Sequence, residues 1–224
     1  MRKMMIRSAE DIEKLVQYYG FLPFFRNSIP GFSVEEHTPA ECWFVDGVEG
    51  PWEWKGPAAR SGRCVYGKFY GGRAGFVSLE MFPDFLNYRR DGYDFDARYD
   101  EGLARNDDKY VYDTVVQRGS ALTGELKKIC GFRKGGRKGF DGIITRLQMK
   151  TYLIISDFVY HIDKKGIPSG WGTACYTTPE KKFGADFTLR AYKNEPQKSK
   201  KKMLEFLAGR LHSAPAKEIS NVIA

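Results

Sequence analysis

The sequence predicts an α+β protein, in which a helical module with a two-stranded ribbon packs on an N-terminal helix and an aromatic β layer. Three observations predict this class: a helical apolar stripe near the N-terminus, a glycine-centred hairpin pattern before residue 80, and three short helices followed by a ribbon after residue 106. The 224 residues are 42% hydrophobic and 29% charged, as is typical of soluble globular proteins. The sequence lacks both an apolar run of about 18 residues and the hydrophobic region of a secretory signal, so we expect a cytoplasmic protein without a membrane span.

The N-terminal helix is well marked. Ser8 is its predicted N-cap, and Gly20 ends it. Its apolar positions recur at helical spacing and predict one buried face, made of Ile12, Leu15, Val16 and Tyr19.

Residues 51–79 are predicted to be β structure. Strands over 64–70 and 73–78 flank Gly71 and Gly72, and two glycines suit the positive φ angles of a two-residue hairpin turn. A short helix is expected over 79–88.

Trp52 and Trp54 would share one face of a strand in this region. Two neighbouring indoles are candidates to stack on a base extruded from a nucleic acid. The alternative, which we favour, is that they form the core of a small β layer.

Residues 89–106 are polar and acidic, without a helical stripe, and predict a linker or a surface loop. In an extended segment Asp94 and Asp96 would point to one side, and such a carboxylate pair is a candidate for activating water. The alternative, which we favour, is an acidic loop whose charge is neutralised by the nearby arginines Arg89, Arg90 and Arg98.

Regular structure resumes at residue 107. Asp107 or Asp108 is expected to cap a helix that ends at Gly119, and Thr123 to cap a second helix whose buried face includes Ile129. A turn rich in glycine and cations follows over 131–139.

A third helix is expected over 140–150, with Phe140, Ile143, Ile144 and Leu147 facing inward. Thr145, Arg146 and Gln148 then point outward or flank the outward face. A strand over 152–160, a lysine-containing connection over 163–170 and a return strand over 171–177 complete the series.

Three helices followed by a ribbon with a basic tip are typical of a winged helix-turn-helix, which sets its third helix in the major groove of DNA. Residues 118–224 carry a net charge of +12, against −4 for residues 1–117, and +7 of it lies within 118–170. A basic half predicts a polyanionic partner, and we expect double-stranded DNA. The residues predicted to contact DNA are Arg133, Lys134, Arg137, Lys138, Thr145, Arg146, Gln148, Lys150, Lys164 and Lys165.

Several segments resemble a known family. The stretches Pro51–Pro57, Tyr66–Phe69, Ala74–Phe76, Asn87–Asp96 and Tyr176–Glu180 are similar to a group of bacterial proteins called AlkZ-related, and the segment 110–178 resembles the winged-helix modules of AlkZ-type DNA glycosylases. The resemblance covers nearly the whole chain. It implies a winged-helix fold and kinship to enzymes that excise alkylated or crosslinked bases from DNA.

Those glycosylases position water with a Gln-x-Gln or Gln-x-Asp pair, which this sequence lacks. The resemblance therefore transfers no catalytic residue, and a reduced DNA glycosylase with Asp94 and Asp96 as its carboxylates stays the enzymatic version of the hypothesis. The alternatives are a winged-helix scaffold that binds protein, and a transcription regulator whose first half is a sensor.

The four cysteines form no C-x-x-C pair and the three histidines lack metal-ligand spacing, which predicts reduced, mostly buried thiols and no metal or cofactor. Three regions are expected along the chain: the helix and hairpin region 1–106, the winged helix 107–180, and a helical extension 181–224. In the last region, the lysines within 198–202 begin a helix and offer either a solvated face or a further phosphate-binding surface.

Overall fold

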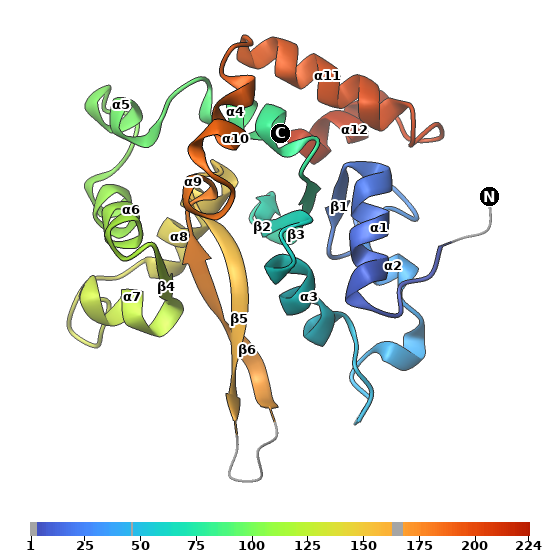
Figure 1. The fold of residues 1–224 in the computed structure, drawn as a ribbon, viewed down its shortest axis with the longest axis horizontal. Helices are drawn as coiled ribbons and strands as arrows, with labels where there is room; N and C mark the ends of the chain where they lie inside the picture. The colour runs from blue at the N-terminus through green and yellow to red at the C-terminus, as the bar shows by residue number, and fades with distance from the viewer. Residues whose placement is uncertain (1–3, 46, 163–167) are drawn as a thin grey trace.

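A computed structural model describes residues 4–45, 47–162 and 168–224 (Figure 1). The described strands are β1 (Phe21–Pro23), β2 (Cys64–Tyr70), β3 (Arg73–Ser78), β4 (Ser120–Leu122), β5 (Ile154–Ile162) and β6 (Pro168–Thr177). The described α-helices are α1 (Ala9–Tyr19), α2 (Val34–His37), α3 (Pro51–Arg60), α4 (Phe82–Arg90), α5 (Phe95–Asp100), α6 (Asn106–Arg118), α7 (Thr123–Ile129), α8 (Phe140–Met149), α9 (Pro179–Phe183), α10 (Ala185–Thr188), α11 (Pro196–Ala208) and α12 (Ala216–Ile223). The fold is α+β, as predicted, and none of the described helices is long and apolar enough to cross a membrane.

One antiparallel sheet runs through the molecule in the order β1-β3-β2-β5-β6-β4. Its two halves meet where Tyr66 of β2 pairs with Ile155 of β5. The sheet therefore joins the hairpin of the N-terminal region to the ribbon of residues 154–177, so both share one framework.

The half of the sheet formed by β1, β3 and β2 is largely buried on both faces, and successive residues of these strands alternate between two cores. Leu22, Tyr66 and Phe76 belong to the core shared with α1, α3, α6 and α8. Phe21, Val65 and Val77 face the opposite way, into the core formed with α4, α11 and α12. This period-two alternation explains why the hairpin is almost continuously apolar, because neither face meets water.

The predictions for the first helix and the hairpin are confirmed. Ser8 Oγ accepts a hydrogen bond from the backbone N–H of Asp11 at 3.3 Å, and Gly20 ends α1 with a φ of 75°. Strands β2 and β3 pair around Gly71 and Gly72, which have φ values of 57° and 79°.

The predicted β structure of residues 51–60 is wrong, because these residues form α3. Pro51 occupies the first helical turn, and the Glu53 carboxylate accepts a hydrogen bond from the Gly50 N–H at 2.8 Å, which satisfies one of the free donors at the helix start. Because the segment is a helix, Trp52 and Trp54 do not share a face: Trp54 is buried, whereas Trp52 is half-buried.

The segment 89–106 is also more regular than predicted. Helix α4 extends to Arg90, the chain turns at Asp91 and Gly92 with positive φ angles of 57° and 78°, and α5 follows before α6 begins. Ser120–Leu122 form the short strand β4, and Ile129, expected to be buried, is 43% exposed.

Candidate nucleic-acid interface

The turn between α7 and α8 folds tightly on itself and directs its cations outward. The backbone N–H groups of Gly136 and Arg137 donate to the carbonyls of Arg133 and Gly131, at 2.8 and 3.0 Å. A Cβ on Gly136 would lie 2.3 Å from the Gly131 carbonyl oxygen, so this position accepts only glycine. Phe132 anchors the turn by packing edge-on against Phe140, with ring centroids 5.2 Å apart.

Four cationic side chains of this turn are exposed, as predicted: Arg133, Lys134, Arg137 and Lys138. We call these four residues the basic turn. Arg137 lies 3.4 Å from an Asp107 carboxylate oxygen and over the ring of Tyr110, whereas no described residue forms an ion pair with the other three. The turn therefore presents positive charge that the rest of the described chain leaves largely uncompensated.

Helix α8 buries the predicted face but is not free on the other side. Phe140, Ile143, Ile144 and Leu147 are buried, as expected. The prediction that Gln148 faces solvent is wrong: its side chain is fully buried, and its Oε1 accepts a hydrogen bond from the Lys68 backbone N–H of β2 at 3.0 Å.

The β2–β3 hairpin also covers Thr145, because a Cβ on Gly72 would lie 3.2 Å from Thr145 Cγ2. Arg146 is half-buried, and its guanidinium donates to both carboxylate oxygens of Asp108 in α6, at 2.5 and 3.1 Å. The hydrogen bond to Asp108 raises the pKa of Arg146. The middle of α8 is thus occupied by contacts within the protein, which the apolar periodicity of the helix could not reveal.

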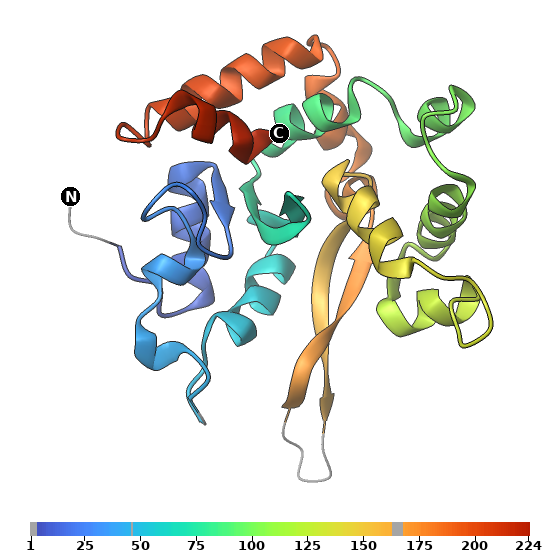
Figure 2. The same cartoon turned by 180° about the vertical axis from the view of Figure 1, so that it is seen from behind.

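The β5–β6 ribbon extends from the sheet beyond the other elements (Figures 1 and 2). Val159 and Ile162 are 47% and 54% exposed along it. The predicted DNA contacts Lys164 and Lys165 lie outside the described residues. Lys150, at the end of α8, is exposed over part of its surface. Burial of the remaining part and the nearby positive charges of Arg98 and Arg89 lower the pKa of Lys150.

Asp94 and Asp96 do not form the extended pair that the sequence suggested. Asp94 is the N-cap of α5, where its Oδ1 accepts from the Ala97 N–H at 2.8 Å, and Asp96 lies in the first helical turn. Asp96 pairs with Lys109 of α6 at 3.0 Å. Both side chains are exposed, and they have separate partners on separate elements.

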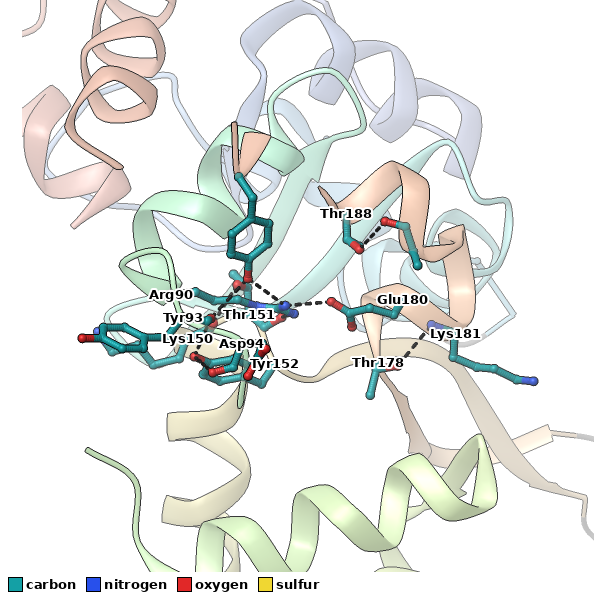
Figure 3. Close-up of polar contacts among 12 residues, drawn as sticks. Arg90, Tyr93, Asp94, Lys150, Thr151, Tyr152, Thr178, Glu180, Lys181 and Thr188 are labelled. Carbon is teal, nitrogen blue, oxygen red and sulfur yellow. Dashed lines mark hydrogen bonds and ion pairs between the residues drawn. The ribbon is translucent and has the colours of Figure 1, made fainter. Parts of the chain in front are cut away.

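Two of the three arginines expected to neutralise these carboxylates, Arg89 and Arg90, contact other groups. Arg89 donates to the carbonyls of Phe69, Met149 and Ile223, at 2.7 to 3.0 Å. Arg90 is buried and donates to Glu180 at 2.7 Å and to the Thr151 carbonyl at 2.8 Å (Figure 3).

Arg90 also lies over the ring of Tyr152, at 4.7 Å, and the hydroxyl of Tyr152 donates to the Tyr93 carbonyl at 3.1 Å. Figure 3 shows Asp94 beside this network and Glu180 approaching it from α9. Contacts made by residues 89–94 therefore hold α4, α8 and α9 together.

Of the two predicted base-stacking residues, only Trp52 lines a hollow at the surface. This hollow measures about 390 Å³ and includes Phe25, Trp43 and Phe44. Trp54, 5% exposed, belongs to the core. Within the described residues, no cluster of three or more His, Cys, Asp or Glu side chains could hold a metal ion.

A second basic surface was not predicted from the sequence. Arg60, Arg118, Lys181 and Lys182 lie around one shallow pocket, although they come from α3, α6 and α9. Their separation in the sequence leaves no local signal, and only the pairing of β4 and β5 with β6 brings their elements together.

The fold and this surface define an α+β protein with one antiparallel sheet, a protruding ribbon and a basic turn. The family model described as AlkZ related matches residues 6–224, and the chain belongs to this family. This confirms the resemblance seen in the sequence. No curated protein and no solved structure matches the chain.

Proposed function

We propose that this protein binds double-stranded DNA in a DNA-repair context, through the basic turn and the β5–β6 ribbon. The observation that carries the proposal is the set of exposed cations in the basic turn, three of them without an ion-pair partner among the described residues. Unpaired surface cations on a rigid turn suit a phosphate backbone, since binding releases the counterions condensed on DNA. Membership of the AlkZ-related family supports the repair context.

The order of elements supports a winged helix-turn-helix as the binding module. Helices α6, α7 and α8 precede the ribbon, and β4 joins that ribbon by pairing with β6, with Ala121 opposite Tyr176. In such a module the turn before the third helix and the tip of the ribbon approach DNA phosphates. Lys164 and Lys165, which lie outside the described residues, stay predicted DNA contacts.

Binding through this surface has little capacity for reading bases. Gln148 is buried, and Thr145 and Arg146 are half-buried against neighbouring elements. Because phosphate contacts carry no direct sequence information, we expect duplexes of different sequence to bind with similar affinity.

We do not extend the proposal to catalysis by Asp94 and Asp96. Asp94 caps a helix and Asp96 pairs with Lys109, so each carboxylate already has a local structural role. Trp52 remains a candidate for base stacking through the aromatic hollow that it lines.

Fluorescence anisotropy of a labelled duplex over a salt series tests the DNA proposal. Reversing two charges of the basic turn, Arg133→Glu with Lys138→Glu, should weaken binding on the order of 10-fold or more and lower the salt slope by roughly 0.9 per lost phosphate contact. The matched control is Lys14→Glu with Lys217→Glu. It makes the same change in net charge at two exposed lysines, on α1 and α12, that belong to no surface proposed to contact DNA.

Absence of duplex binding by the unaltered protein at low salt would contradict the proposal. Equal weakening by the two double variants would also contradict it, because the effect would then follow net charge and not the basic turn.

Protein binding by the same module is the second candidate function, favoured by exposed apolar side chains. Ile129 of α7 and Val116 of α6 are 43% and 50% exposed. A single substitution, Ile129→Glu, would disrupt a protein contact and leave the affinity for DNA unchanged.

A further inference from the structure

The pocket formed by Arg60, Arg118, Lys181 and Lys182 has no role in the proposed contact through the basic turn. It is an open depression of about 470 Å³ at the base of the ribbon. Figures 1 and 2 show α8 and α9 on opposite sides of this base, and Lys181 and Lys182 belong to α9. The pocket thus lies on the α9 side, away from the face against which α8 packs.

Two of the four cations are fixed in place by the fold. Lys182 is partly buried, and its Nζ donates to the carbonyls of Ala59 and Ser156. Burial lowers the pKa of Lys182. Arg60 is held by Asp157, with its Nη1 2.6 Å from the carboxylate. These contacts hold Arg60 and Lys182 in the lining of the pocket.

The other two cations are available to a ligand. Lys181 is exposed and forms no ion pair with any described residue. The Lys181 side chain runs close to Gly119, because a Cβ on Gly119 would lie 3.2 Å from Lys181 Cε. Arg118 is 45% exposed along its side chain and has only a long contact, 3.6 Å, to Glu125.

Negative charge around the pocket is already engaged. Asp157 accepts from Arg60 and from its own neighbour, the Phe158 N–H, at 2.7 Å. Glu125 accepts from the Leu122 N–H at 2.9 Å, which caps the start of α7. Four cations against two engaged carboxylates leave the pocket net positive.

We propose that this pocket binds a phosphate group. A guanidinium and an ammonium that converge from two helices, over fixed positive charge, match an anion with several oxygens pointing in different directions. The proposal rests on the proposed function for the source of that phosphate, which is the sugar–phosphate backbone of DNA. The α9 side of the ribbon would then be a second contact with the nucleic acid.

Cys175 makes the pocket directly testable, because this residue lines the pocket and is half-buried, whereas Cys42, Cys64 and Cys130 are buried. The rate of Cys175 alkylation by iodoacetamide, followed by mass spectrometry of the full chain, reports whether the pocket is occupied. We expect saturating duplex DNA to slow alkylation at least several-fold. The variant Cys175→Ser supplies the background rate.

A double variant tests whether this protection depends on Arg118 and Lys181. Arg118→Ala with Lys181→Ala should abolish the protection and lower the salt slope for duplex binding by roughly 1 to 2. Lys14→Ala with Lys217→Ala, at exposed lysines of α1 and α12, is the matched control with the same loss of charge and should change neither measurement.

The source of the phosphate is decided by a second probe, inorganic pyrophosphate. Protection by duplex DNA supports a nucleic-acid contact, and protection by pyrophosphate alone supports a site for a small phosphorylated molecule. Protection by neither probe overturns the proposal. If the basic-turn variant loses DNA binding while Cys175 stays unprotected in the unaltered protein, the phosphate pocket is refuted and the proposed function stands.

Discussion

Arg89 and Arg90 lie inside the protein, whereas Arg133 and Lys138 lie on its surface, although both pairs sit beside turns that contain residues with positive φ angles. The inner pair binds backbone carbonyls and one carboxylate. The outer pair forms no ion pair with a described residue. Cationic side chains thus have two roles in this protein. The buried pair binds groups within the fold, whereas the exposed pair faces solvent.

The inner pair shows what a buried cation contributes to this fold. Met149 is the last residue of α8 and Ile223 the last of α12, so Arg89 caps the C-termini of two helices at once. A guanidinium is well placed there, because unpaired carbonyls and the negative end of the helix dipole meet it. Burial lowers the pKa of Arg89 to about 10, which leaves it charged at neutral pH.

Removing Arg90 should give the largest effect on stability. Arg90→Met leaves Glu180 and the Thr151 carbonyl without their donor, and we expect the free energy of unfolding to fall by about 3 to 5 kcal/mol. Arg90→Lys keeps the charge but not the fork of donors, so its loss should be intermediate. Urea unfolding followed by circular dichroism measures both.

The exposed control for this experiment is Arg133→Met. It should change the free energy of unfolding by no more than about 0.5 kcal/mol, because Arg133 has no partner to lose among the described residues. Similar losses in Arg90→Met and Arg133→Met would break the distinction between the two groups.

Gln148 sharpens the comparison, because it was expected on the outer surface and belongs to the inner group. Gln148→Ala leaves the Lys68 N–H without its acceptor, and we expect a loss of about 1 to 3 kcal/mol in stability. Thr145→Ala, on the same helix, should cost less, and neither change should alter preference among duplex sequences. A change in sequence preference for Gln148→Ala would show that the hairpin moves away from α8 on binding.

Local patterns in the sequence predicted much of this fold. The cap at Ser8, the glycine turn at 71–72 and the inward face of α8 depend on neighbours a few residues away, and all three are confirmed. The basic turn was found for the same reason, because its cations are adjacent in the chain.

Several errors have a different cause, which is contact between distant segments. Gln148 accepts a hydrogen bond from the Lys68 backbone N–H, and Arg90 donates one to Glu180. Neither partner can be inferred from the sequence pattern around Gln148 or Arg90. The phosphate pocket is the same case, because β pairing brings Arg118 and Lys181 together. At residues 51–60, local signals for a helix start, Pro51 and Glu53, were present but were outweighed by the aromatic content.

The smallest expected effect on stability concerns Lys55, which allows a buried lysine to be compared with an exposed one. Lys55 is 2% exposed, lies over the rings of Trp52 and Phe158, and donates to the Trp52 carbonyl at 2.6 Å. Burial lowers the pKa of Lys55 to about 8. Between that value and its ordinary pKa, the unfolded chain binds more protons than the folded one, so stability rises with pH.

Lys55→Met removes this titration while keeping a similar shape. Between pH 7 and 9 the unaltered protein should therefore gain about 1 kcal/mol relative to the variant, measured by urea unfolding at each pH. The range stops at pH 9 because burial also raises the pKa of Cys64, to about 12, so above pH 9 ionisation of this thiol in the unfolded chain lowers the stability of both proteins and offsets the gain from Lys55. Lys217→Met, at an exposed lysine, should show no such difference from the unaltered protein. Equal pH dependence in both variants would mean that Lys55 titrates like a surface lysine and that its aromatic enclosure opens in solution.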